Sequence, residues 1–153
     1  MPPDGPLMLG PFAVGTDGRL GLDGASAGFS LRWRGRMAHA RLDRAGQLGF
    51  ALVLGRVPSS AGALAGARHG AFTALAGLRR GLPAGWHVAL RADHRALAET
   101  SCRLDLPTSA GALLAAVTAA LLDLAPYLAA LDAAAPLFEP PGASVGSVNT
   151  WPG

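Results

Sequence analysis

Residues 29–54, FSLRWRGRMAHARLDRAGQLGFALVL, alternate apolar and polar side chains with a period of two. That period is typical of β-strands that bury only one face. The apolar positions fall into three sets, which are Phe29, Leu31 and Trp33; Ala38, Ala40 and Leu42; and Leu48, Phe50, Leu52 and Leu54. The stretch therefore predicts three consecutive strands joined as an antiparallel meander.

The first turn of this meander is expected at residues 35–36. Glycine in the first position of a two-residue loop suits a type II′ turn. This loop pairs Trp33 with Ala38 on the apolar face, and it places Arg32 opposite His39 on the other face.

The second turn is expected to be a three-residue loop over residues 44–46. Gly46 then occupies the position that needs a left-handed backbone in a type I turn followed by a bulge. Turn chemistry and apolar pattern agree, which favours the assignment. The resulting pairs are Leu42 with Leu48, Ala40 with Phe50 and Ala38 with Leu52.

A helix is predicted after the meander, because apolar residues recur at helical spacing and the segment RRGLP supplies a C-terminal stop signal. The cap is Ser59 or Ser60, and the stripe comprises Leu64, Arg68, Phe72, Leu75 and Leu78. A second stripe of small residues leaves two interpretations open: a smooth surface for another backbone, or a frayed start with the helix beginning near Ala67. Its members are Gly62, Gly66, Gly70 and Ala74.

Residues 86–102, WHVALRADHRALAETSC, concentrate histidines, carboxylates and the single cysteine. The apolar residues of the two halves of this segment share one face of a sheet only if an odd number of residues forms the loop between two strands. The simplest such loop is 93–95. This register puts Cys102 in the core opposite Trp86, whereas His87 opposes Ser101 on the outer face. It also separates His94 from both. A hairpin is therefore expected, with Glu99 and Arg91 forming a surface ion pair.

The final helix is expected to start after Thr108 or Ser109 and to kink at Pro126. Its core stripe is Leu113, Val117, Leu121, Leu124, Leu128 and Leu131. Leu114, Leu122 and alanines on its other sides leave little polar surface, which indicates a subunit interface or a bound apolar segment. The candidate partner-binding residues here are Leu114, Leu122 and Tyr127.

The predicted domain organisation has three parts. Residues 1–27 are expected to be irregular or extended, with a short hairpin around Asp17 and Gly18. Residues 28–134 form one α+β domain, in which two helices pack on a twisted antiparallel sheet of about five strands in the order βββ-α-ββ-α. Residues 135–153 form a Pro/Gly-rich tail that is expected to be disordered.

Composition and motifs favour a cytoplasmic protein without a catalytic site. All 13 basic residues are arginine, and the net charge is +3. The absence of lysine removes phosphate-loop and Schiff-base chemistry. No C-x-x-C or H-E-x-x-H spacing is present, so no metal, cofactor or catalytic residue is predicted. The start lacks signal-peptide features, and Asp123 and Pro126 disfavour a membrane span for the last helix.

Two G-x-S-x-G matches, around Ser26 and Ser144, lack the strand–turn–helix context of a nucleophile elbow.

A basic patch is predicted on the outer face of the meander, and its members are Arg32, Arg34, His39 and Arg41. This patch lacks the aromatic platform that base stacking needs, which disfavours nucleic acid. Solvated surface is one interpretation of the patch; an acidic protein segment or another subunit is the alternative.

The element order from Phe29 to about Ala133, with a last helix after CRLDLPTSAGALLAAVTAAL, resembles the type III secretion chaperone-like (CesT / YbjN-like) fold. The resemblance rests on topology and covers about residues 28–133. It implies a small dimer that holds an extended segment of an effector, or acts as an adaptor. The Pro/Gly-rich N-terminus and the basic composition depart from the family pattern.

The leading hypothesis is a non-enzymatic, chaperone-like or adaptor protein, expected as a homodimer, that binds a polypeptide segment. A small-ligand or enzymatic site is the second hypothesis; it requires a histidine to converge with a carboxylate in a cavity. A nucleic-acid adaptor acting through the arginine-rich sheet face is the third.

Overall fold

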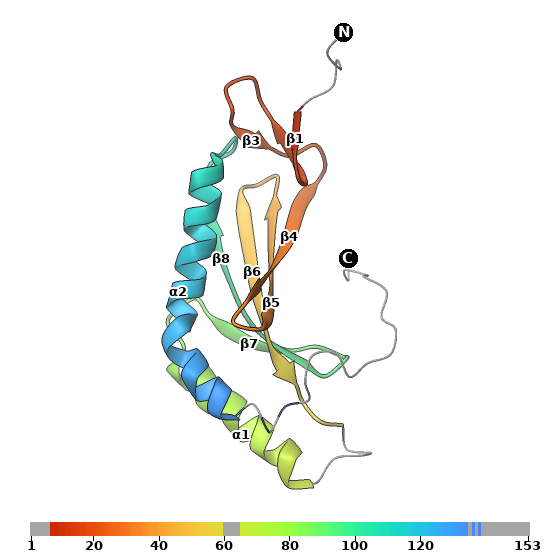
Figure 1. Cartoon of the computed structure of the whole chain (residues 1–153), viewed down its shortest axis with the longest axis vertical. Coiled ribbons are helices and arrows are strands. Elements are labelled where there is room, and N and C mark those ends of the chain that lie inside the picture. The colour runs from red at the N-terminus through yellow and green to blue at the C-terminus, as the bar shows by residue number, and fades with distance from the viewer. Residues whose placement is uncertain (1–6, 60–64, 135, 137, 139–153) are drawn as a thin grey trace.

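The computed structural model describes residues 7–59, 65–134, 136 and 138 of the chain. It contains two helices and two antiparallel sheets, which confirms the α+β class (Figure 1). The elements are β1 (Leu7–Leu9), β2 (Phe12–Val14), β3 (Leu20–Gly21), β4 (Ser26–Trp33), β5 (Arg36–Asp43), β6 (Gln47–Arg56), α1 (Ala65–Gly81), β7 (His87–Leu90), β8 (Arg95–Arg103) and α2 (Ala110–Ala134).

The main sheet has five strands in the order β4-β5-β6-β8-β7, with every neighbouring pair antiparallel. The meander predicted from residues 29–54 supplies β4, β5 and β6. The hairpin β7–β8 joins beside β6 and not beside β4, so that β4 and β7 are the two edge strands.

The turn between β5 and β6 has the predicted register. Leu42 pairs with Leu48, and the next two predicted pairs follow. Gly46 has a φ of +80°, as the left-handed position of the loop requires. Its N–H donates to the carbonyl of Asp43, and its carbonyl accepts from the Leu104 N–H. Gly46 therefore fixes both the turn and its contact with the end of β8.

The turn between β4 and β5 lies one residue earlier in the chain than the predicted turn at residues 35–36. The loop is 34–35, because Trp33 pairs with Arg36. Arg34 and Gly35 both have positive φ, 48° and 76°, which is the pattern of a type I′ turn. The strand pairing consequently shifts by two residues, so that the inward face is preserved but each cross-strand neighbour changes.

The small sheet β1-β2-β3 covers one end of the main sheet and carries Phe12 and Leu20 into the core. β2 and β3 pair across a turn that contains Asp17 and Gly18. Leu20 of β3 also exchanges two backbone hydrogen bonds with Thr108, at 2.6 and 2.9 Å, just before α2 begins. This bridge joins the N-terminal sheet to the start of the last helix (Figure 1).

The core lies between α1, α2 and one face of the main sheet. Five of the six residues of the predicted α2 stripe are buried, and Leu121 is only partly buried; the buried ones are Leu113, Val117, Leu124, Leu128 and Leu131. Ser109 caps α2 by accepting the Ala112 N–H at 3.0 Å. Pro126 lies inside α2, and the helix changes direction in its C-terminal half (Figure 1). A proline there cannot donate to the preceding turn, which explains the bend.

The expected stripe of α1 is wrong at Phe72, whose side chain is 39% exposed. Leu75 and Leu78 of the predicted stripe are buried, and Ala71 takes the core position in place of Phe72. The Arg68 guanidinium lies 5.1 Å from the ring centre of Phe72 and covers one side of it. Of the other predicted features, Gly66 has open space around it, whereas Ser60, Gly62 and Leu64 lie outside the described residues.

Candidate functional site

The face of the main sheet that turns away from the helices carries one row of polar side chains in register. Successive pairings place Ser30 beside His39, His39 beside Ala51, Ala51 beside Glu99, and Glu99 beside His87. The middle strand contributes only a methyl group to this row. Polar groups on β5 therefore face those on β8 and β7 across a gap.

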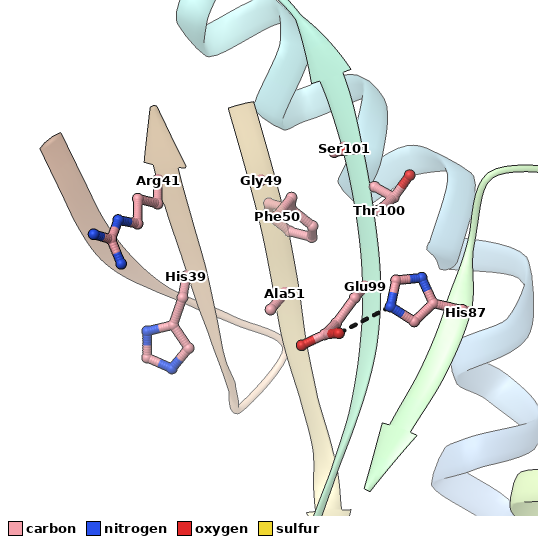
Figure 2. A pocket seen from close by; sticks show the side chains of 9 residues that line it. All are labelled: His39, Arg41, Gly49, Phe50, Ala51, His87, Glu99, Thr100 and Ser101. Atoms are coloured by element: carbon pink, nitrogen blue, oxygen red, sulfur yellow. Dashed lines mark hydrogen bonds and ion pairs between the residues drawn. The ribbon is translucent and has the colours of Figure 1, made fainter. Parts of the chain in front are cut away.

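This gap is a shallow groove of about 280 Å³ (Figure 2). Gly49 and Ala51 of β6 form its floor, because neither has a side chain large enough to fill the space between the neighbouring strands. His39 and Arg41 line one wall, whereas His87, Glu99, Thr100 and Ser101 lie on the other side.

Glu99 is the centre of the polar network on the β8 wall. Its Oε2 lies 2.9 Å from His87 Nε2, and its Oε1 accepts from the Arg91 guanidinium. The predicted Glu99–Arg91 ion pair is therefore present. The predicted pairing of His87 with Ser101 is wrong, because the turn of the β7–β8 hairpin is 92–94 and shifts the pairing by two residues. His94 adopts the left-handed conformation, with a φ of 66°, that closes this loop.

His39 occupies the opposite wall. Its Nδ1 is 2.7 Å from the Ser30 hydroxyl. Burial lowers the pKa of His39, and the positive charge of Arg95 lowers it further. The neutral imidazole is thus the form that the folded protein favours at this position.

The lowered pKa of His39 predicts a pH dependence of stability. Because the folded state disfavours the imidazolium, this residue has no effect well above the unfolded pKa and destabilises the protein as the pH falls below about 6.5. Urea unfolding at pH 7 and pH 5 should show a smaller loss of stability in His39→Gln than in the wild type. His69→Gln, on the exposed side of α1, is the control. An unchanged pH dependence in His39→Gln would contradict the assignment.

The predicted basic patch is divided in the structure. His39 and Arg41 line the groove, and the Arg41 Nε donates to the Ser26 hydroxyl at 2.9 Å. Arg32 pairs with Met37 and not with His39, as a result of the type I′ turn. Arg34 lies in that turn, with its guanidinium 5.2 Å from the centre of the Trp33 ring.

A second surface is the outward side of α2. Leu114 and Leu122 are 61% and 64% exposed, and no charged residue occurs from Ala110 to Leu122. Tyr127 does not belong to this surface, because it is half-buried and faces Gly81 at the end of α1. By length and composition, α2 is also the one helix among the described residues that passes as a membrane-span candidate; 28% of its most apolar window is buried.

Cys102 differs from its predicted position, because it is exposed. It pairs with Leu48 on one side, but β7 begins only at His87, opposite Glu99, and leaves Cys102 uncovered on the other side. Trp86 packs edge-on against Phe50 instead, with a centroid distance of 6.1 Å. Among the described residues, no group of three or more His, Cys, Asp or Glu is placed to hold a metal ion. Ser26 lies within β4, and Ser144 falls outside the described part of the chain.

The sheet groove brings His39 and His87 to the same site as a carboxylate, which is the convergence that a small-ligand site requires. Enclosed ligand pockets typically measure roughly 300–1,000 Å³. This groove is smaller and open, and both oxygens of Glu99 are already engaged. The geometry thus suits contact with a chain laid over the sheet better than enclosure of a substrate.

The sequence indicated the outward face of β5 but missed the groove. The missed signal is the pair of small residues Gly49 and Ala51 at outward positions of β6, between strands with long polar side chains. Together, the two sheets, the groove and the uncharged helix face define an α+β protein with open surfaces. No protein-family model, curated protein or solved structure matches the chain.

Proposed function

We propose that this chain is a non-enzymatic, chaperone-like or adaptor protein that binds a polypeptide segment through the outward face of α2. One observation carries the proposal: two leucines that are more than 60% exposed lie on a helical stretch without charge. Soluble proteins seldom leave such a surface in water unless a partner covers it.

The pattern of the face indicates the kind of segment that fits. Leu114 and Leu122 are eight positions apart, which is about 12 Å along a helix. Ala115, Thr118 and Ala119 lie between them and are exposed, so that the surface there is low and smooth. An amphipathic helix can place its apolar residues over these small side chains, between the two leucines. The absence of charge favours a partner whose contacting stripe is also uncharged.

The remaining surface is consistent with a binding protein. The sheet groove offers polar contacts on its walls, and the exposed apolar residues Leu7, Met8 and Leu9 follow one another on β1. The resemblance of the element order to secretion chaperones points in the same direction. Burial of one leucine side chain stabilises a complex by about 1.5–3 kcal/mol, so each α2 leucine is expected to contribute at least about tenfold in affinity.

The test is suppression of the aggregation of reduced insulin, followed by light scattering. The wild-type protein should delay aggregation, whereas Leu114→Arg and Leu122→Arg should each need at least about tenfold more protein for the same delay. Leu90→Arg is the control, because Leu90 is 47% exposed but lies on β7. Equal activity of all three variants, or no activity of the wild type, would count against the proposal.

A further inference from the structure

The two edges of the main sheet are protected differently. β7 has four residues, and α1 packs against it. β4 has eight residues, and none of the described strands pairs with its outer edge. β4 contains no proline and pairs with β5 without a bulge. A long, regular edge strand presents unpaired backbone groups that other strands can pair with, and proteins usually block such edges.

The side chains of β4 also indicate that its cover is incomplete. Phe29, Leu31 and Trp33 point to the core side, but all three are only partly buried. The outward positions are small and uncharged, except for Arg32. One more strand beside β4 would extend the cover of the apolar residues on the core face.

We infer that β4 pairs with β4 of a second copy of this chain, antiparallel across a two-fold axis that passes through Ser30. The two-fold axis is perpendicular to the sheet, so the core faces of both copies lie on the same side. Even-numbered residues of one copy therefore pair with even-numbered residues of the other, and odd-numbered residues with odd-numbered ones. In the register centred on Ser30, Arg32 faces Gly28 of the second copy, and Leu31 faces Phe29.

The extent of β4 selects this register over its neighbours. A register centred on Phe29 would place Trp33 opposite Ala25 of the second copy, which lies outside the strand. A register centred on Leu31 would draw Arg34 into the pairing, although its φ of 48° belongs to the turn.

The register centred on Ser30 is also the most self-complementary. Residues 27–33 all find extended partners, which gives roughly seven backbone hydrogen bonds. Trp33, the largest residue of the strand, faces Ala27, one of the smallest. The dimer has a continuous sheet across both copies and leaves the outward face of α2 exposed, so it is independent of the proposed function.

Cysteine cross-linking tests this register in the full chain with Cys102→Ser as background. Paired Cα atoms of antiparallel strands are about 4.5–5.5 Å apart, which suits a disulfide. Ser30→Cys should therefore form a disulfide-linked dimer under mild oxidation at least about tenfold faster than Ser26→Cys. In the inferred register, the two copies of residue 26 are about 27 Å apart along the strand. Equal rates for the two variants, or no cross-link at residue 30, would overturn the inference.

Analytical ultracentrifugation gives a second readout that does not depend on oxidation. The wild-type chain should sediment as a dimer. Ser30→Arg should shift it to the monomer, because two guanidinium groups would face each other at the axis. Ser101→Arg, the same change on the outer face of the interior strand β8, should remain dimeric. A dimer that persists in Ser30→Arg would overturn the inference. Suppression of aggregation through α2 does not require dimerisation through β4, so either proposal can fail while the other holds.

Discussion

Replacing Gly46 by alanine is expected to lower the free energy of unfolding by about 3 kcal/mol or more. The φ of Gly46 is +80°, which L-residues rarely adopt. A Cβ at this position would lie 2.1 Å from the carbonyl oxygen of Leu104. The backbone must shift to relieve this overlap, and the hydrogen bond from the Leu104 N–H to the Gly46 carbonyl would be strained. Urea denaturation followed by circular dichroism measures the loss.

Gly35→Ala is the matched control. Gly35 has nearly the same φ, +76°, but an added Cβ would meet nothing within 4 Å. The free energy of unfolding of this variant should fall only by the cost of holding alanine at a positive φ, about 1 kcal/mol. The difference between the two variants isolates the contact with Leu104. If Gly46→Ala were no more destabilising than Gly35→Ala, then the turn would not pack against the end of β8 as described.

Leu124→Ala is expected to destabilise the protein by about 2–5 kcal/mol. Leu124 is 0% exposed and lies on the core side of α2, between the helix and the sheet. Removing its branched end leaves a cavity whose lining loses contacts with no compensation from water. Thermal or urea unfolding monitored by tryptophan fluorescence reports the change.

Leu122→Ala controls for helix propensity, since it makes the same change two residues away on the same helix. Leu122 is 64% exposed, so this substitution should change stability by less than about 0.5 kcal/mol. Similar losses at the two positions would mean that α2 is covered on its outward side in the isolated protein. That result would also weaken the assignment of this side to a partner.

The sequence predicts which residues of each strand face the core, because a shift of the strand pairing by two residues leaves every side chain on the same face of the sheet. The exact cross-strand neighbours could be predicted only at the turn that contains Gly46. In the other two turns a non-glycine residue, Arg34 or His94, adopts the left-handed conformation. The sequence favoured glycine or a different loop there, since side chains seldom tolerate positive φ.

These two turns explain what the sequence could not show about the site. Because β4 shifted against β5, Ser30 and not Arg32 contacts His39. Because β7 shifted against β8, His87 contacts Glu99, and Cys102 has no residue of β7 beside it. The groove depends on the β7–β8 pairing that brings His87 to Glu99, together with the small residues on β6. The small residues alone do not show which polar side chains lie on either side of them.

The bridge between Leu20 and Thr108 closes a loop that contains the whole five-stranded sheet and α1. A short N-terminal hairpin is thereby coupled to the first turn of the last helix. Detaching β1, β2 and β3 would remove Phe12 and Leu20 from the core and also release the backbone next to the cap of α2. The N-terminal sheet therefore acts as a latch on the fold: proteolytic cleavage before Ser26 would loosen the opposite end of the chain as well as the segment that was cut.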